Sequence, residues 1–290
     1  MSIYRKVGSR LHSLFDGTRW HDLGAPAAAL AENPRWVSTT NCVFWIDVPT
    51  ARLHVWHERT GAHNTCQLST ELCAIAARTD GQLVVAEGNS LNVFDPQSTT
   101  NTPWCTIAEF DTSSVRVNDA AWASDGSLWL TTMSLDGQSP LGSLYRVTDT
   151  GDTERLQFDL VIGNGPAFDH RLRRAYLADS PRRTVFRIDE DTPTKRTPFA
   201  QLHANEGFPD GMAVDANGNL WVAHYDGACI SVWSPYGTRM KTVHTPFQTP
   251  TALVFLPSKD DKIRCVVTCA SPSSGSVGAL WLLTVKNAFV

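Results

Sequence analysis

The sequence predicts an all-β protein, a six-bladed β-propeller that residues 1–290 form as a single domain. Three observations lead to this prediction. A short apolar segment recurs six times, each copy is followed by a second strand-like segment, and no amphipathic segment of helical length separates the copies. Repeats of about 40–45 residues that each hold several strands are typical of propeller blades.

The recurring segments carry the strand signal. Each is rich in Val, Leu, Trp or Tyr, the composition of strands that are buried on both faces. They are residues 42–47, 81–87, 126–132, 173–179, 218–224 and 263–269. Short polar or Gly-bearing turns lead to a second set of segments, so that each pair predicts a hairpin. The second set comprises residues 52–56, 91–95, 143–147, 184–189, 229–233 and 279–283.

A third apolar segment precedes each hairpin and gives the repeat its period. Equivalent positions in this segment are 39 to 47 residues apart, and they are Trp36, Ile75, Trp122, Phe168, Val214 and Phe255. We expect a fourth strand in the linker after each hairpin. We also expect the segment from Leu11 to Trp20 to supply the outer strand of the last blade.

Composition and charge exclude several classes of protein. The chain is 42% apolar and 19% charged, with a net charge of −4, so nothing predicts nucleic-acid or anionic-membrane partners. Seven cysteines without a CxxC pair indicate reduced thiols and not a zinc cluster. Neither a signal-peptide pattern nor an apolar stretch of about 20 residues is found, which predicts a cytoplasmic protein. The sequence does not predict its oligomeric state.

Polar residues stand four positions before each of the equivalent apolar positions. Because the innermost strand of each blade lines the central channel, we expect these side chains to face one axis. They are Glu32, Glu71, Asn118, Asn164, Asp210 and Thr251. Glu32, Asn118, Asn164 and Asp210 all offer oxygen ligands, which predicts a metal-binding channel with one divalent cation: Zn, Ca, Mn or Fe(II). Alternatively, each caps a turn at the start of a strand.

Other catalytic patterns are missing from the sequence. It contains no GxSxG turn, no phosphate-binding glycine loop and no HxH or HExxH pair. A serine-nucleophile hydrolase is therefore disfavoured. Among the histidines, only His224 follows a buried strand of the repeat that holds Asp210, and it could approach the channel mouth.

Five stretches together resemble the senescence marker protein/regucalcin/gluconolactonase family of sugar lactonases. They read LAENPRW, RVNDAAWASDGSLWLTTM, GNGPAFD, YLADS and PDGMAVDANGNLWVA, and they fall in the family's order over most of the chain. The family usually has glycine at the positions of Ala31, Asn33 and Ala120, and leucine at that of Pro166. None of these four departures removes a proposed ligand.

The resemblance implies a role for each site residue. Glu32, Asn164 and Asp210 would hold the cation, with Asn118 as a fourth ligand or linked through water and substrate. Asp210 would also act as the general base. Arg116 and Asn118 would contact the substrate, and so would Asp136, three positions after the methionine of the second motif.

The implied activity is the metal-dependent opening of a sugar lactone to the aldonic acid by a carboxylic-ester hydrolase. Two alternatives remain open. The first is hydrolysis of other esters or organophosphates, as in the related diisopropylfluorophosphatase and paraoxonase. The second is a non-enzymatic, calcium-binding propeller. A polar channel with Arg116 and Asp136 favours sugars, whereas an apolar rim favours other esters.

Overall fold

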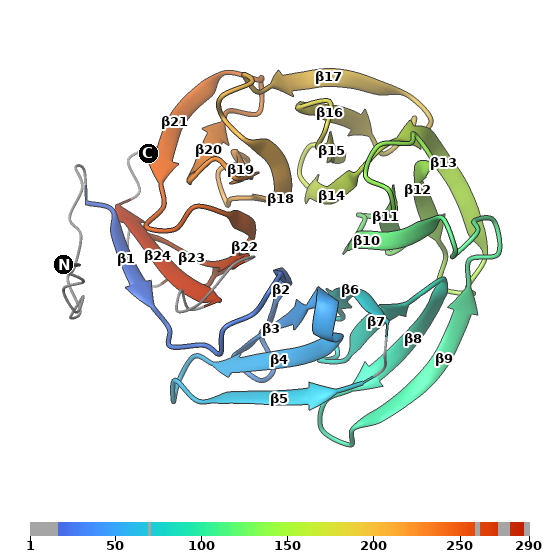
Figure 1. Ribbon diagram of the computed structural model, residues 1–290, viewed down its shortest axis with the longest axis horizontal. Helices are drawn as coiled ribbons and strands as arrows, with labels where there is room; N and C mark the ends of the chain where they lie inside the picture. Colours follow the sequence, from blue (N-terminus) through green and yellow to red (C-terminus); the bar gives the residue numbers. More distant parts are fainter. Residues whose placement is uncertain (1–16, 69–70, 259–261, 272–278, 287–290) are drawn as a thin grey trace, which may run out of the picture.

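Six four-stranded antiparallel sheets surround a central axis, as Figure 1 shows in a view along that axis. The computed structural model describes residues 17–68, 71–258, 262–271 and 279–286. Each sheet is one blade, so the predicted six-bladed β-propeller is confirmed. Within the described residues the only helix is the 3-10 turn η1 (Val48–Thr50), and no helix there is long and apolar enough to cross a membrane.

Each predicted repeat forms one blade. The innermost strands are β2 (Ala31–Val37), β6 (Leu72–Ala77), β10 (Val115–Trp122), β14 (Gly163–Asp169), β18 (Phe208–Val214) and β22 (Pro250–Leu256). The second strands are β3 (Cys42–Asp47), β7 (Leu83–Glu87), β11 (Leu128–Ser134), β15 (Arg174–Asp179), β19 (Leu220–Tyr225) and β23 (Lys262–Cys269). These bounds agree with the predicted segments to within a few residues, because strong apolar runs mark them.

The outer half of each blade completes the sheet. The third strands are β4 (Arg52–His57), β8 (Ser90–Asp95), β12 (Gly142–Val147), β16 (Thr184–Asp189), β20 (Cys229–Trp233) and β24 (Leu280–Lys286). In the first five blades the fourth strand lies in the linker, as predicted. These strands are β5 (His63–Gln67), β9 (Thr100–Thr106), β13 (Thr153–Leu160), β17 (Arg196–Gln201) and β21 (Arg239–His244).

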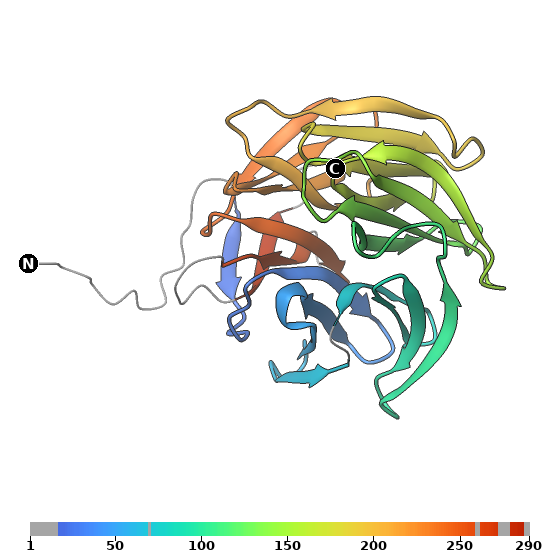
Figure 2. The ribbon, with the colours of Figure 1, turned by 45° about the vertical axis from the view of Figure 1, so that its right-hand side comes forward.

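An N-terminal strand closes the ring. Strand β1 (Arg19–Asp22) pairs with β24, with Trp20 opposite Leu283, and so completes the last blade (Figures 1 and 2). The Trp20 indole donates to the His244 carbonyl at 3.0 Å. The predicted outer strand thus lies at 19–22, and residues 11–16 of the expected segment fall outside the described part of the chain.

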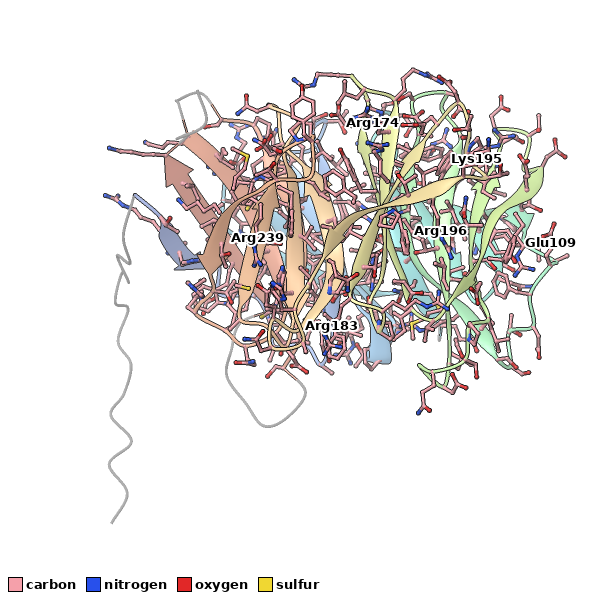
Figure 3. All side chains as sticks on the ribbon, turned by 90° about the horizontal axis from the view of Figure 1, so that it is seen from above. Glu109, Arg174, Arg183, Lys195, Arg196 and Arg239 are labelled. Carbon is pink, nitrogen blue, oxygen red and sulfur yellow. The ribbon has the colours of Figure 1, made fainter. Side chains whose placement is uncertain are left out.

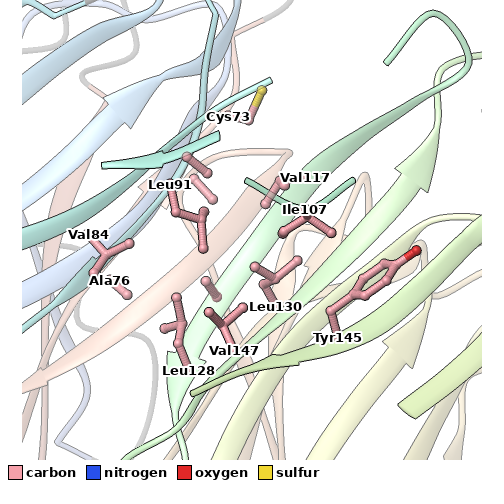
Figure 4. Close-up of a cluster of buried hydrophobic side chains, with 13 residues drawn as sticks. Cys73, Ala76, Val84, Leu91, Ile107, Val117, Leu128, Leu130, Tyr145 and Val147 are labelled. Carbon is pink, nitrogen blue, oxygen red and sulfur yellow. The ribbon is translucent and has the colours of Figure 1, made fainter. Parts of the chain in front are cut away.

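The core lies between neighbouring blades. Figure 4 shows one such layer, in which Val84 and Leu91 of the second blade meet Val117, Leu130 and Tyr145 of the third. Because every blade is covered on both faces, its second strand is apolar at almost every position; all six residues of β3 are buried. The repeating apolar segments of the sequence are therefore the middle layer of each blade.

Each innermost strand carries a register shift near its start. A β-bulge turns side chains away from the regular alternation, and bulges are common next to active sites. The shifts lie at Glu32/Arg35, Leu72/Ala74, Val117/Asp119, Asn164/Ala167, Pro209/Met212 and Pro250/Leu253. These bulges were not predicted from the sequence, although they lie at or beside the polar positions of the repeat.

Candidate active site at the propeller axis

A cavity of about 450 Å³ opens at the end of the channel where the innermost strands begin. Its lining includes Glu32, Asn118, Asn164 and Asp210, the four predicted oxygen ligands, together with Arg116. These residues come from four different blades. Their spacing in the repeat brings them together because each stands at, or directly beside, the bulge of its own innermost strand.

A chain of hydrogen bonds fixes the orientation of the two amides. Ser180 Oγ donates to the Pro209 carbonyl at 2.7 Å and accepts from Asn164 Nδ2 at 2.9 Å. Asn118 Nδ2 in turn donates to Asn164 Oδ1 at 3.0 Å and to the Gly163 carbonyl at 2.9 Å. Because a carbonyl can only accept, the chain runs in one direction. Both Asn118 amide hydrogens are used, so its Oδ1 is left for the cavity.

The two carboxylates are poorly solvated and repel other negative groups nearby. Burial, followed by the neighbouring Asp119 carboxylate, raises the pKa of Glu32 to about 7. Burial, followed by the charges of Glu32 and Asp119, raises the pKa of Asp210 well above its usual value. The protein alone therefore does not compensate two negative charges at this place.

Asp119 has a cationic partner of its own. Arg35 lies 2.5 Å from the Asp119 carboxylate and also donates to the carbonyls of Ile75 and Ala120, each at 2.9 Å. This guanidinium thus links the first three blades below the cavity. It lines a second, smaller cavity at the opposite end of the channel, so Arg35 and Asp119 separate the two ends.

Arg116 is the cationic group of the cavity. Its guanidinium donates to the Val117 carbonyl at 3.0 Å. Burial lowers the pKa of Arg116, while the charges of Cys73, Glu32 and Asp210 act in the opposite direction. A cationic group beside two carboxylates can orient a substrate oxygen toward them.

The donor set fits a divalent cation. Two under-compensated carboxylates supply negative charge, and the amide oxygens of Asn118 and Asn164 complete an all-oxygen set. No group of three or more His, Cys, Asp or Glu side chains that could hold a metal occurs in the described part of the chain. A cation here would therefore depend on the amide oxygens as well as on the two carboxylates.

Two predicted ring positions do not reach the cavity. Thr251 is fully buried, and its hydroxyl donates to the Ala31 carbonyl at 2.5 Å, which ties β22 to β2. Glu71 is exposed, precedes β6 and is not among the lining residues. Four of the six equivalent positions thus form the site, and the other two do not.

Asp136 and His224 also lie outside the lining. Asp136 is exposed, and its carboxylate accepts hydrogen bonds from Ser134, Gln138 and Ser139 of its own loop, which lower its pKa. His224 is fully buried between the Glu206 carbonyl at 2.8 Å and Ser231 Oγ at 2.7 Å. The structure does not bring either side chain to the other site residues.

The rim of the cavity is apolar, a feature that the sequence analysis did not predict. Six side chains form it, and each is partly exposed. They are Leu30, Met133, Ile162, Pro181, Phe208 and Tyr225. They lie at or next to strand ends in several blades, so no single sequence motif indicates that they meet.

Two residues that support the amide ligands were not predicted from the sequence. Ser180 belongs to the YLADS motif, but only the structure reveals its hydrogen bonds to Asn164 and to the Pro209 carbonyl. Asn33 replaces a family glycine and has φ of 52°, a left-handed conformation that asparagine tolerates better than most residues. Its side chain accepts from the Ile75 amide at 3.1 Å and donates to the Asn118 carbonyl at 3.4 Å.

Solved structures of other proteins share this fold. A regucalcin of Agrobacterium tumefaciens has the same fold, with a TM-score of 0.82 at 23% identity over 95% of this chain and 96% of its own. A gluconolactonase of Xanthomonas campestris gives 0.74 at 22% identity, covering 92% and 90% of the two chains. At such identities the likeness shows the fold alone.

Sequence comparison finds more closely related proteins. The pentonolactonase of Haloferax volcanii is 28% identical over 86% of this chain and 84% of its own length. The 6-deoxy-6-sulfogluconolactonase of Pseudomonas putida is 29% identical over 79% of each chain. The family model described as SMP-30/Gluconolactonase/LRE-like region matches residues 30–270. This chain therefore belongs to the SMP-30/gluconolactonase/LRE-like family.

Proposed function

We propose that the protein is a metal-dependent carboxylic-ester hydrolase that opens a sugar lactone to its hydroxy acid. The observation that carries the proposal is the convergence of Glu32, Asn118, Asn164, Asp210 and Arg116 on one cavity. The names of the pentonolactonase and sulfogluconolactonase relatives support a lactone as the substrate. A small-molecule cavity of a few hundred Å³ at the axis is of suitable size for such a ring.

Glu32, Asn164 and Asp210 would hold one divalent cation, with Asn118 as a further ligand or substrate contact. When bound, the cation would polarise the lactone carbonyl, stabilise the negative charge on its oxygen and keep Asp210 ionised at neutral pH. The hydrogen-bond chain through Ser180 directs the amide groups beforehand. The site is therefore organised before the substrate enters.

Asp210 would act as the general base. It accepts a proton from the attacking water, whose oxygen bonds to the carbonyl carbon. The bond between that carbon and the ring oxygen then breaks, and the proton held by Asp210 passes to the departing ring oxygen. Arg116 orients the carbonyl during these steps. The product is a hydroxy acid, and the reaction needs water but no oxidant and no other substrate.

Hydrolysis of another ester or of an organophosphate is the second candidate function, and the apolar rim is the observation that favours it. Both reactions would use the same groups of this chain. A calcium-binding propeller without activity is the third reading. It requires that the cation be fully coordinated by the protein, with no position open to a substrate.

A pH-indicator assay over a panel of aldonolactones tests the proposal. The samples are the metal-loaded protein, a chelator-treated sample and Asp210→Asn, and cation binding to each is measured in parallel. We expect acid release only from the metal-loaded unmodified protein. Tight cation binding without acid release from any lactone or ester would support the non-enzymatic reading.

A further inference from the structure

The apolar rim of the cavity is partly open to solvent in the described structure. Its six side chains are partly exposed where they border the cavity, directly above the polar groups of the floor. Phe208 is held in place, because the Arg183 guanidinium lies 4.1 Å from its ring centroid and donates to the Gly207 carbonyl at 3.2 Å. Figure 3, viewed from the side, labels Arg183 near one face of the propeller and Arg174 near the other.

Met133 and Ile162 continue this wall from the neighbouring blades. Their backbones form an isolated antiparallel bridge between the third and fourth blades. The bridge fixes the two side chains relative to each other at the cavity edge. The rim is therefore a preformed apolar surface that is continuous with the catalytic floor.

The cavity offers few hydrogen-bond donors to a polyol, and its acceptors belong to the floor and not to the rim. Both amide hydrogens of Asn118 bind protein oxygens, and the Ser180 hydroxyl is used by Asn164 and the Pro209 carbonyl. The carboxylate of Asp136, which the family resemblance implied as a substrate contact, is occupied by its own loop. In the described lining, Arg116 and the Tyr225 hydroxyl are left as donors, and the Asn118 Oδ1 with the oxygens of Glu32 and Asp210 that a cation does not take up are left as acceptors; the other five rim side chains offer neither.

Hydroxyls of an aldonolactone that extend from the floor to the rim would consequently meet hydrocarbon. Hydroxyls that are buried without partners weaken binding, whereas methylene groups on the same surface strengthen it. Discrimination is strongest when a buried polar group is left unpaired. The observations thus favour a substrate with hydrocarbon where an aldonolactone has hydroxyls.

We propose that the preferred lactone carries an alkyl substituent, which packs on Met133, Ile162 and Phe208 while its carbonyl faces Arg116 and Asp210. This inference rests on the proposed lactone hydrolysis. Water adds its oxygen to the carbonyl carbon, the ring ester bond breaks, and the ring oxygen takes up a proton. The alkyl group remains on the carbon that bears the released hydroxyl.

The test compares γ-lactones whose alkyl chain grows from methyl to hexyl with aldono-1,4-lactones, on the metal-loaded protein. Each buried methylene adds about fourfold to kcat/KM, so the value rises along the series until the wall is covered. The aldonolactones give lower values than the longer alkyl lactones. Because the series uses the unmodified protein, its outcome does not depend on the folding of a variant.

Two variants locate the effect. Ile162→Asn lowers kcat/KM for the hexyl lactone about tenfold more than for the methyl lactone, because it removes hydrocarbon from the wall. Leu172→Asn is the control, since Leu172 is 44% exposed in the turn between β14 and β15, away from the cavity. It leaves the series unchanged.

The results separate this inference from the proposed function. Hydrolysis of aldonolactones that needs Asp210, with a flat or falling alkyl series, would overturn the alkyl preference and leave lactone hydrolysis standing. Absence of hydrolysis with every lactone of both kinds would overturn both. A rising series that Ile162→Asn flattens supports both.

Discussion

At the scale of single residues, Ser180 decides which atoms of the site face the cavity. Its hydroxyl donates to the Pro209 carbonyl, so it can only accept from Asn164, and Asn164 in turn accepts from Asn118. Groups that orient metal ligands commonly change affinity as much as some ligands do. Ser180 lines the cavity, but its hydroxyl is taken up by the Asn164 amide and the Pro209 carbonyl, so we infer that it acts as a positioning residue.

Replacing Ser180 by alanine tests its role in the proposed cation site. We expect Ser180→Ala to lower the affinity for Mn²⁺ about 10- to 100-fold, because the Asn164 amide loses the acceptor that fixes its direction. Isothermal titration calorimetry measures the affinity. Ser127→Ala is the matched control, since the buried Ser127 hydroxyl donates to Asp125 and accepts from the Trp129 indole in a turn of the third blade that does not line the cavity. Equal affinities for the two variants would refute the positioning role.

The pKa of Glu32 predicts how the metal-free protein responds to pH. Its pKa is about 7 when folded, against an ordinary value of 4.5, so the folded state holds the proton more tightly. The contribution of Glu32 to the free energy of unfolding is thus largest below about pH 4.5. It falls by roughly 3 kcal/mol as pH rises to about 7. Asp210 shifts in the same direction.

Denaturant unfolding of chelator-treated protein at pH 5 and pH 8 measures this effect. We expect Glu32→Gln to be the more stable protein at pH 8 and to differ less between the two pH values, because the amide carries no charge. Saturating cation should also reduce the dependence. Identical pH profiles for the unmodified protein and Glu32→Gln would contradict the destabilising effect of an ionised Glu32 beside Asp210.

At the scale of elements, the bulges of the innermost strands place the site. The shift between Val117 and Asp119 sets Asn118 apart from the ladder, and corresponding shifts follow Glu32 and Asn164. In the fourth case Asp210 itself lies within the shift, between Pro209 and Met212. In four blades the bulge brings the repeated sequence position into one convergent set of side chains, whereas the bulges of the second and sixth blades do not bring Glu71 or Thr251 there.

Arg35 holds three of these strands together. Its guanidinium binds Asp119 and the carbonyls of Ile75 and Ala120, and Asp119 is almost completely buried. Arg35→Leu leaves the Asp119 charge uncompensated, and we expect a loss of about 3–5 kcal/mol in the free energy of unfolding. Denaturant titration measures it. The double variant Arg35→Leu/Asp119→Asn should recover part of the loss; a loss that is equal in both variants would contradict this account.

Periodicity explains how much of the fold and site the sequence could predict. The middle strands stand out because both faces are buried, and the repeat then locates Glu32, Asn118, Asn164 and Asp210. The same repeat spacing also predicted Glu71 and Thr251 as channel residues, and these two do not reach the cavity. The difference depends on local backbone geometry and on hydrogen bonds such as that of Thr251 to the Ala31 carbonyl, and residue spacing does not encode these.

Contacts between distant loops could not be predicted in this way. The rim residues Leu30, Ile162 and Phe208 occupy no common repeat position, so only the closed ring brings them to one cavity. Asp136 follows a family motif, yet the serines of its own loop take up its carboxylate. Both cases depend on tertiary structure.

At the scale of the whole molecule, closure of the ring joins the first described strand to the last. Strand β1 pairs with β24, and the Trp20 ring packs edge-on against Phe247 with centroids 5.6 Å apart. An open ring would expose the edge of β24, and exposed edges promote aggregation. Closure therefore stabilises the arrangement of all six blades, including those that carry the site.

Substitutions of Trp20 test whether this closure stabilises the protein. We expect Trp20→Ala to lower the free energy of unfolding by about 3–5 kcal/mol, because it removes a large aromatic contact and the bond to the His244 carbonyl. Trp20→Phe, which retains a ring against Phe247, should lose less. Thermal unfolding monitored with light scattering reports both stability and aggregation. Similar losses for the two variants would mean that the ring contact contributes little.

The most direct test of the central claim is a cation titration of the chelator-treated protein, with bound cation and lactone hydrolysis followed on the same samples. The hydrolytic rate is predicted to rise in proportion to occupancy and to stop at one cation per chain. Glu32→Gln should lose binding and rate together. A full rate in the cation-free protein, or a rate that does not follow occupancy of this site, would contradict a hydrolytic metal centre at the propeller axis.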